Sequence, residues 1–224
     1  RASKQATSTI PIVVAAVGDP VEAGLVASLA RPGGNLTGLT FFFAEICAKR
    51  VELIKETIPT LTWLAVLVNP ANPSHLVALS VMQDMASALG VELVSADAKG
   101  RDDIAAAIAT LAARRAQGLV AIDDPVLIST ARQIASLALQ NSLPMIGFKP
   151  YAEVGALLEY GVDLADLYSR SAAFVDKILK GTPPADLPIE RAVKFELIVN
   201  LKTAKALGIE LPTSILLRAN EVLE

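Results

Sequence analysis

Polar residues stand directly after four apolar runs of the sequence, and their types could bind a charged ligand. The four segments read GDP at 18–20, NPANP at 69–73, DDP at 123–125 and FKPY at 148–151. A proline in the first turn of a helix leaves neighbouring N–H groups free, and with the helix dipole these groups attract an anion. Asp and Asn side chains beside them can bind an ammonium group. Together the four segments would suit a zwitterion such as an amino acid.

Each segment also has a purely structural interpretation, because Asp-Pro and Asn-Pro are ordinary turn and helix-start pairs. Four similar segments in one chain favour a shared cleft over four unrelated turns. Tyr151 ends the last of them and could stack on a ligand or hydrogen-bond to it.

The adjacent carboxylates Asp123 and Asp124 are the best candidates for acid–base chemistry. Two close carboxylates can raise the pKa of one of them. Neighbours in sequence point apart, however, so we expect one to point inward and the other to cap the helix that follows. The sequence has no G-x-S-x-G, G-x-x-x-x-G-K-[ST] or H-E-x-x-H motif, which favours a protein that is not an enzyme.

The chain has one cysteine, Cys47, and one histidine, His75, so it cannot form an internal disulfide. The neighbours of Cys47 predict a packed, inert thiol on a helix. One histidine and one distant cysteine do not make a zinc site, and we expect no metal or cofactor. A nucleophilic pair of Cys47 and His75 is an alternative that the sequence leaves open.

Short apolar runs alternate along the chain with Ala- and Leu-rich segments of helical spacing. The runs that predict strands are 10–17, 36–42, 63–68, 91–97, 118–123, 144–148 and 156–161. The segments that predict helices are 19–30, 44–58, 74–90, 101–116, 124–142 and 164–181, and 195–208 predicts a strand feeding a helix. This alternation indicates an α/β fold with parallel sheets flanked by helices. Ligands of such sheets bind outside the carboxyl ends of the strands, where the four polar segments lie.

Composition narrows the class of protein further. Of 224 residues 53% are hydrophobic and 19% are charged, so the chain can bury a full core. The net charge is -3 and no basic stripe stands out, which makes nucleic acid a poor candidate partner. No apolar run is long enough to span a membrane. The opening RASKQATSTIP has no initiator Met and no apolar signal-peptide region, which predicts a cut or processed chain.

Three blocks of the sequence match a known family in combination. They read STIPIVVAAVGDPVEAGLVASLARPGGNLTGLTF, AVLVNPANP and FELIVNLKTAKALGIELPTSILLRANEVLE. The chain resembles, over essentially its whole length, the substrate-binding proteins of ABC transporters, in the group that includes tryptophan-type binding proteins. The resemblance implies a two-lobed, type I periplasmic-binding fold that closes on a ligand, a permease partner in the membrane and a location in the periplasm or outside the cell envelope.

The resemblance also implies how the chain divides. Residues 1–37 and 155–183 would belong to the first lobe, and residues 38–154 and 184–224 to the second. By position, the predicted ligand contacts come from loops of both lobes. They are Asp19, Pro20, Asn69, Asn72, Asp124 and Tyr151.

Family members usually carry about a hundred more residues at the front, so the resemblance implies a first lobe that lacks roughly three βα units. Such a lobe would expose apolar edges, from which we predict a homo-oligomer.

Three hypotheses about the function remain. The first is a non-catalytic importer component that binds an amino acid or a similar small carboxylate. The second is a ligand-sensing or oligomerisation module that no longer transports. The third is an enzyme on the same scaffold, with Asp123 and Asp124 as its acid–base pair.

Overall fold

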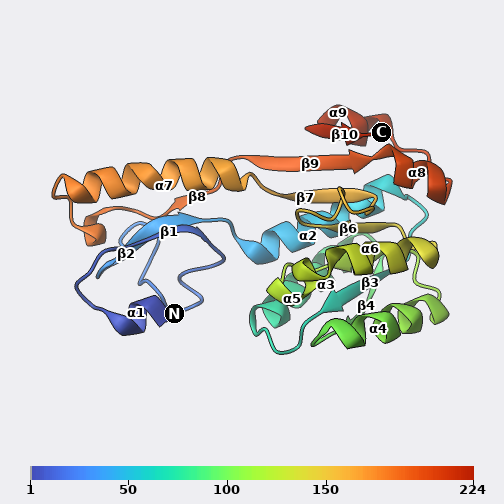
Figure 1. Cartoon of the computed structure of the whole chain (residues 1–224), viewed down its shortest axis with the longest axis horizontal. Helices are drawn as coiled ribbons and strands as arrows, with labels where there is room; N and C mark the ends of the chain where they lie inside the picture. Colours follow the sequence, from blue (N-terminus) through green and yellow to red (C-terminus); the bar gives the residue numbers. More distant parts are fainter. Residues whose placement is uncertain (1) are drawn as a thin grey trace. The chain divides into compact units, whose positions relative to one another are not determined.

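The computed structural model describes residues 2–224, which divide into two compact units (Figure 1). Unit 1 extends to Phe43 and resumes over Val162–Phe195, whereas unit 2 comprises Ala44–Gly161 and Glu196–Glu224. The chain therefore passes between the units three times.

Each passage lies later in the chain than the sequence predicts, and strand pairing explains all three differences. Strand β2 (Leu36–Thr40) pairs with β1 and so stays in unit 1 beyond residue 37. Strand β7 (Leu158–Val162) pairs with β6 and so keeps residues 155–161 in unit 2. Strand β8 (Glu190–Arg191) pairs with β2 and extends unit 1 beyond residue 183.

Unit 1 contains a three-stranded parallel sheet of order β1-β2-β8, in which β1 spans Ile12–Val17. Helix α7 (Leu164–Leu179) packs along β1 and β2, and its side chains Leu167 and Phe174 are buried. The short helix α1 (Ala2–Ala6) and the 3₁₀ turn Pro184–Asp186 complete the elements described in this unit.

Unit 2 is built on a seven-stranded sheet of order β10-β9-β7-β6-β5-β3-β4. Its strands besides β7 are β3 (Trp63–Val68), β4 (Glu92–Asp97), β5 (Leu119–Ala121), β6 (Met145–Gly147), β9 (Phe195–Asn200) and β10 (Glu221–Leu223). Strands β4, β3, β5, β6 and β7 pair in parallel in that order. The central strands β3 and β5 are buried along almost their whole length, as expected of a sheet covered on both faces.

Helices connect the strands of unit 2 and supply its core. They are α2 (Phe43–Thr57), α3 (Ser74–Ala88), α4 (Arg101–Ala113), α5 (Pro125–Ser129), α6 (Ala131–Gln140), α8 (Leu201–Leu207) and α9 (Thr213–Arg218). Side chains of α4 and α6, such as Ile108 and Ile134, join Leu67 and Leu119 of the sheet in one apolar cluster. The α/β class and the parallel flanked sheets predicted from the sequence are thus confirmed.

Two predicted helices differ from the structure. Residues 19–30 form turns rather than a helix, and Gly24 adopts a φ of 65°, a left-handed conformation that ends a helical turn. The predicted helix 124–142 is divided into α5 and α6 at Thr130, whose hydroxyl donates to the Val126 carbonyl oxygen at 2.8 Å. A Thr side chain that bonds the backbone in this way disturbs helical continuity.

Candidate functional site

The candidate site lies where the strand order of unit 2 reverses. From β3 the chain moves outward to β4 and then crosses back to β5 on the other side of β3. The loops after β3 and β5 therefore leave the same sheet edge in opposite directions, which is the usual place of a ligand crevice in open parallel sheets. Asn69 and Asn72 follow β3, and Asp123 and Asp124 follow β5.

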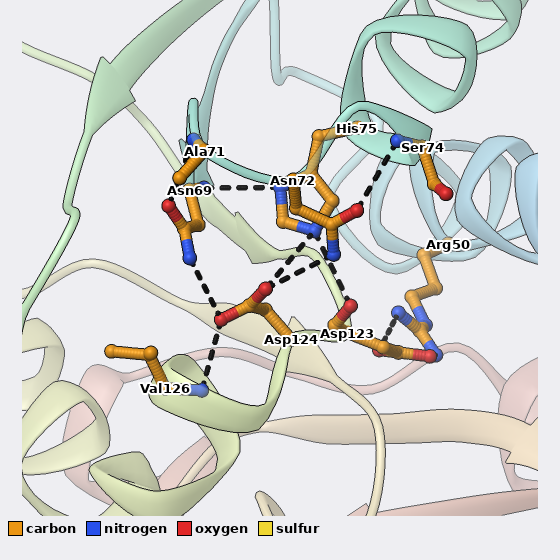
Figure 2. Close-up of polar contacts among 9 residues, drawn as sticks. All are labelled: Arg50, Asn69, Ala71, Asn72, Ser74, His75, Asp123, Asp124 and Val126. Atoms are coloured by element: carbon orange, nitrogen blue, oxygen red, sulfur yellow. Dashed lines mark hydrogen bonds and ion pairs between the residues drawn. The ribbon is translucent and has the colours of Figure 1, made fainter. Parts of the chain in front are cut away.

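Asp124 joins the two loops (Figure 2). Its Oδ1 accepts hydrogen bonds from Asn69 Nδ2 at 3.1 Å and from the Val126 backbone N–H at 2.9 Å. Its Oδ2 accepts one from Asn72 Nδ2 at 3.1 Å. Asp124 thus caps α5 and fixes both asparagines of the neighbouring loop.

The charge of Asp124 is stabilised although its side chain is only 4% exposed. Burial by itself would raise the pKa of this carboxyl. The hydrogen bonds from Asn72, Asn69 and the Val126 N–H outweigh burial, so the pKa of Asp124 is lowered. The sheet edge therefore holds a fixed anion at neutral pH.

His75 lies beneath the same loop and is buried. Its Nδ1 accepts a hydrogen bond from the Asn69 backbone N–H at 3.0 Å, and its Nε2 lies 3.3 Å from the Asp123 carbonyl oxygen. Because Nδ1 is an acceptor, the ring proton is on Nε2, from which it can be donated to Asp123. The imidazole thus connects the loop after β3 with the loop after β5 (Figure 2).

Arg50 holds the second carboxylate of the site. Its Nη1 and Nη2 bind Asp123 Oδ1 and Oδ2 at 2.6 and 3.0 Å, and its Nε donates to the Tyr160 carbonyl oxygen at 2.8 Å. The Arg50 side chain is fully buried, whereas that of Asp123 is 16% exposed. Burial opposes the Arg50 charge but the Asp123 carboxylate outweighs it, so the pKa of Arg50 is raised and the ion pair persists.

The two carboxylates point apart, as expected from the sequence: Asp123 points toward Arg50, and Asp124 caps α5. Asp123 binds Arg50, whereas Asp124 binds the two asparagines and the Val126 N–H, so the two carboxylates have separate partners and no hydrogen bond to each other is seen among the described contacts. Among the described residues no group of three or more His, Cys, Asp or Glu side chains could hold a metal ion.

The structure brings together three of the six predicted ligand residues, namely Asn69, Asn72 and Asp124. Tyr151 is fully buried instead of lying on the rim, because its ring packs in the core of unit 2 and its hydroxyl donates to the Leu127 carbonyl oxygen at 3.0 Å. Asp19 and Pro20 belong to unit 1, where Asp19 Oδ1 accepts from the N–H groups of Val21 and Glu22.

Cys47 is fully buried on α2, and burial raises the pKa of its thiol to about 12. The packed thiol predicted from the sequence is thereby confirmed, and the His75 imidazole contacts Asn69 and Asp123. Arg50 was not predicted as a site residue. The signal for it is a charged residue on the apolar face of α2, beside Cys47, Val51 and Ile54.

Comparison with known proteins agrees with this fold. The family described as ABC transporter substrate binding protein matches residues 1–223. The chain belongs to that family. A tyrosine-binding protein of Clostridioides difficile is 29% identical over 211 residues, which are 94% of this chain and 60% of the relative. The chain thus spans less than two thirds of the length of this curated relative.

Two solved structures show the same fold at higher coverage. A conserved domain protein from Vibrio cholerae is 33% identical with a TM-score of 0.90, and the match covers 99% of this chain and 74% of that one. An ABC domain from Streptococcus pneumonia, solved in complex with L-Trp, is 26% identical with a TM-score of 0.88, covering 98% and 76%. The fold is therefore of the periplasmic-binding type. Within residues 2–224, no helix is both long and apolar enough to cross a membrane.

Proposed function

We propose that this chain is the solute-binding component of an ABC-type importer and that it binds an amino acid or a similar small carboxylate without catalysis. The observation that carries the proposal is the convergence of Asn69, Asn72, Asp123 and Asp124 at the sheet edge of unit 2. This edge is the place where α/β sheets bind ligands. The family membership and the relatives that bind tyrosine or tryptophan support the amino-acid class.

The residues of the edge have different tasks in this proposal. Asp124 and Asn69 are buried and already hydrogen-bonded to protein partners, so they act by fixing the loops. Asn72 and the Asp123 carboxylate are partly exposed and can meet the ligand. An anionic Asp123 suits the ammonium group of an amino acid. Asp19 and Pro20 stay proposed as contacts from unit 1, and Tyr151 would act from the core by supporting the loop after β6.

A thermal-shift screen of the chain against the L-amino acids and a set of aromatic carboxylates tests the proposal. A ligand that binds only the folded state raises the melting temperature in a saturable way. We expect such a rise with L-tyrosine, L-tryptophan or a chemically close compound. No shift with any compound would contradict binding by this chain.

The remaining parts of the proposal concern partners and place. The closed, ligand-bound form would be recognised by a membrane permease, outside the cytoplasmic membrane, as in the family. Binding of the ligand-loaded chain to its cognate permease in detergent or nanodiscs, compared with the ligand-free chain, measures this directly. Equal binding of both forms would contradict recognition of the closed state.

A second candidate is an oligomerisation or ligand-sensing module of the same fold, and one surface of unit 1 favours it. Helix α7 exposes Tyr168, Val175 and Leu179 on one face, with Tyr168 63% and Leu179 82% exposed. Exposed apolar faces of this kind are typical of surfaces that associate. Light scattering of the purified chain tests whether this surface associates, and we expect a homo-oligomer. A monodisperse monomer at working concentration would contradict the oligomer.

A further inference from the structure

His75 is buried between the two loops of the candidate site, although histidine is rarely needed to fill a core. It is the second residue of α3 and is only 1% exposed. One ring nitrogen faces the backbone N–H of Asn69, and the other faces the backbone carbonyl of Asp123. The ring thus contacts the backbone of the residue that follows β3 and of a residue that follows β5.

These two contacts require a neutral imidazole in one tautomer. Nδ1 must carry a lone pair to accept from Asn69, and Nε2 must carry the proton to donate to Asp123. A second proton could only go on Nδ1, where it would face the Asn69 N–H. Two donors would then oppose each other at the present distance of 3.0 Å, and the loop after β3 would have to move.

The charged groups around the ring act in opposite directions. Asp124 Oδ2 lies 3.9 Å from Nε2 and favours protonation, as does the nearby Asp123, whose carboxylate is held by Arg50 of α2. Burial favours the neutral ring and is the largest effect, so the pKa of His75 is lowered from 6.5. The ring is therefore neutral at pH 7.5.

We propose that neutral His75 is a positioning residue that fixes the two loops of the candidate site, and that protonation of this ring at acidic pH releases the ligand. The second half of the proposal rests on the proposed function, whereas the first half concerns the free protein alone.

The loop that would move carries the amide groups of the site. Asn69 presents its backbone N–H to His75 and its side-chain Nδ2 to Asp124. The Asn69 carbonyl also accepts from the Asn72 N–H at 3.0 Å. Displacing the Asn69 backbone therefore shifts Asn72, which is the partly exposed amide of the site. Ligand affinity is thereby linked to one proton on one ring.

The first experiment follows the ring itself in the ligand-free chain. Because the sequence holds a single histidine, one imidazole signal reports on it without assignment. Long-range ¹H–¹⁵N NMR spectra should show the Nε2–H tautomer at pH 7.5 and a pKa below 6.5. The backbone amide signal of Asn69 should titrate with the same midpoint. An Nδ1–H tautomer, or an Asn69 amide signal that does not titrate with the ring, would contradict the proposal that His75 fixes the two loops.

The second experiment measures the affinity for L-tyrosine or L-tryptophan by calorimetry between pH 7.5 and 5. Below the His75 pKa the dissociation constant should rise by about tenfold per pH unit, as expected for one linked proton. His75→Asn keeps an acceptor near the position of Nδ1 and does not titrate, so its affinity should stay within about threefold over this range. His75→Gln is the second non-titrating variant, in case the first does not fold.

The outcomes separate the two proposals. A wild-type affinity that does not change with pH would overturn ligand release by His75 while leaving the proposed function intact. An equal pH dependence in the wild type and in a folded His75 variant would also overturn it. Absence of binding at every pH would contradict the proposed function and the ligand release with it. The NMR titration would still test whether neutral His75 fixes the two loops.

Discussion

Asp124 is the residue on which the geometry of the site depends most. One carboxylate accepts from Asn69 and Asn72 of the loop after β3 and from the Val126 N–H of α5. Removing it leaves the two asparagine side chains without their acceptor and α5 without its N-cap, and a lost Asp cap alone costs about 1 kcal/mol.

Asp124→Ala should therefore weaken binding of the amino-acid ligand at least tenfold. The affinity is measured by calorimetry on the folded variant, whose circular dichroism spectrum serves as the control. Asp124→Asn is the milder variant, because one side-chain oxygen remains to accept from Val126. An unchanged affinity of Asp124→Ala would show that the ligand does not depend on this edge.

Arg50 gives a second test at the scale of single residues, because its neighbour on α2 provides a matched control. Arg50 is fully buried and paired with Asp123, whereas Lys49 is partly exposed and paired with Glu52 on the same helix. Removing one partner of a buried ion pair costs about 3–5 kcal/mol, whereas an exposed pair contributes at most about 1 kcal/mol.

Arg50→Met should accordingly lower the free energy of unfolding by several times more than Lys49→Met. Urea denaturation of the two variants beside the wild type measures the difference. Equal losses would mean that the Arg50 pair contributes no more than a surface contact. The variant Arg50→Met/Asp123→Leu should recover part of the loss, since it leaves no unpaired charge.

At the scale of elements, the order of the strands accounts for both the success and the limits of prediction from sequence. The apolar runs predicted the positions of the strands closely, and the run at 63–68 coincides with β3. Asn69, Asn72 and Asp124 were predicted at strand ends because polar residues interrupt apolar runs there. Their mutual contacts were not predictable, since they depend on β3 lying beside β5, which no local pattern encodes.

Residues whose role depends on their burial in the folded chain were predicted less well. Tyr151 follows a strand, as a rim residue would, but the loop after β6 folds back and buries its ring. Arg50 lies among apolar residues of α2 and His75 lies at the start of α3, and only the packing of the two helices places both side chains beside the site. The predicted helix 19–30 failed for a local reason, because Gly24 takes the left-handed conformation.

The pairing of β1 with β2 gives a prediction for an element. Gly38 of β2 has a φ of 133°, and a Cβ added there would overlap the Val14 carbonyl oxygen of β1. Gly24 also has a positive φ, of 65°, but a Cβ there meets no atom within 4 Å. Both positions disfavour a side chain through their positive φ, but only at Gly38 does a Cβ also meet a neighbouring strand.

Gly38→Ala should therefore cost much more stability than Gly24→Ala. Backbone strain alone is worth about 1–2 kcal/mol per residue, and Gly38→Ala adds the separation of two strands to it. Thermal denaturation of both variants gives the comparison. A Gly38→Ala variant no less stable than Gly24→Ala would show that β1 and β2 do not approach as described.

At the scale of the whole molecule, two buried groups limit the pH range of stability, one on the acidic side and one on the alkaline side. The pKa of His75 is lowered from 6.5 in the folded chain, so the unfolded chain binds a proton first as the pH falls. The pKa of Cys47 is raised from 9.0 to about 12, so the unfolded chain loses a proton first as the pH rises. Stability should therefore be lost below about pH 6.5 and again above about pH 9.

Urea denaturation across pH 5–10.5 should give a maximum between these limits, and each group has a variant that tests its side. Cys47→Ala should lessen the loss between pH 9 and 10.5, which can reach about 1.4 kcal/mol per pH unit for one group. His75→Asn should lessen the loss between pH 6.5 and 5. Variants that follow the wild-type profile throughout would assign the pH dependence to other groups.

The central claim is that an amino acid binds at the sheet edge formed by the loops after β3 and β5. The most direct measurement is a ¹H–¹⁵N NMR titration of the labelled chain with L-tyrosine or L-tryptophan. The account predicts that the largest shifts fall on the backbone amides of Asn69–His75 and Asp123–Val126, with smaller shifts in α8, α9 and β10. Shifts confined to other parts of unit 2, or no shifts at saturating ligand, would contradict it.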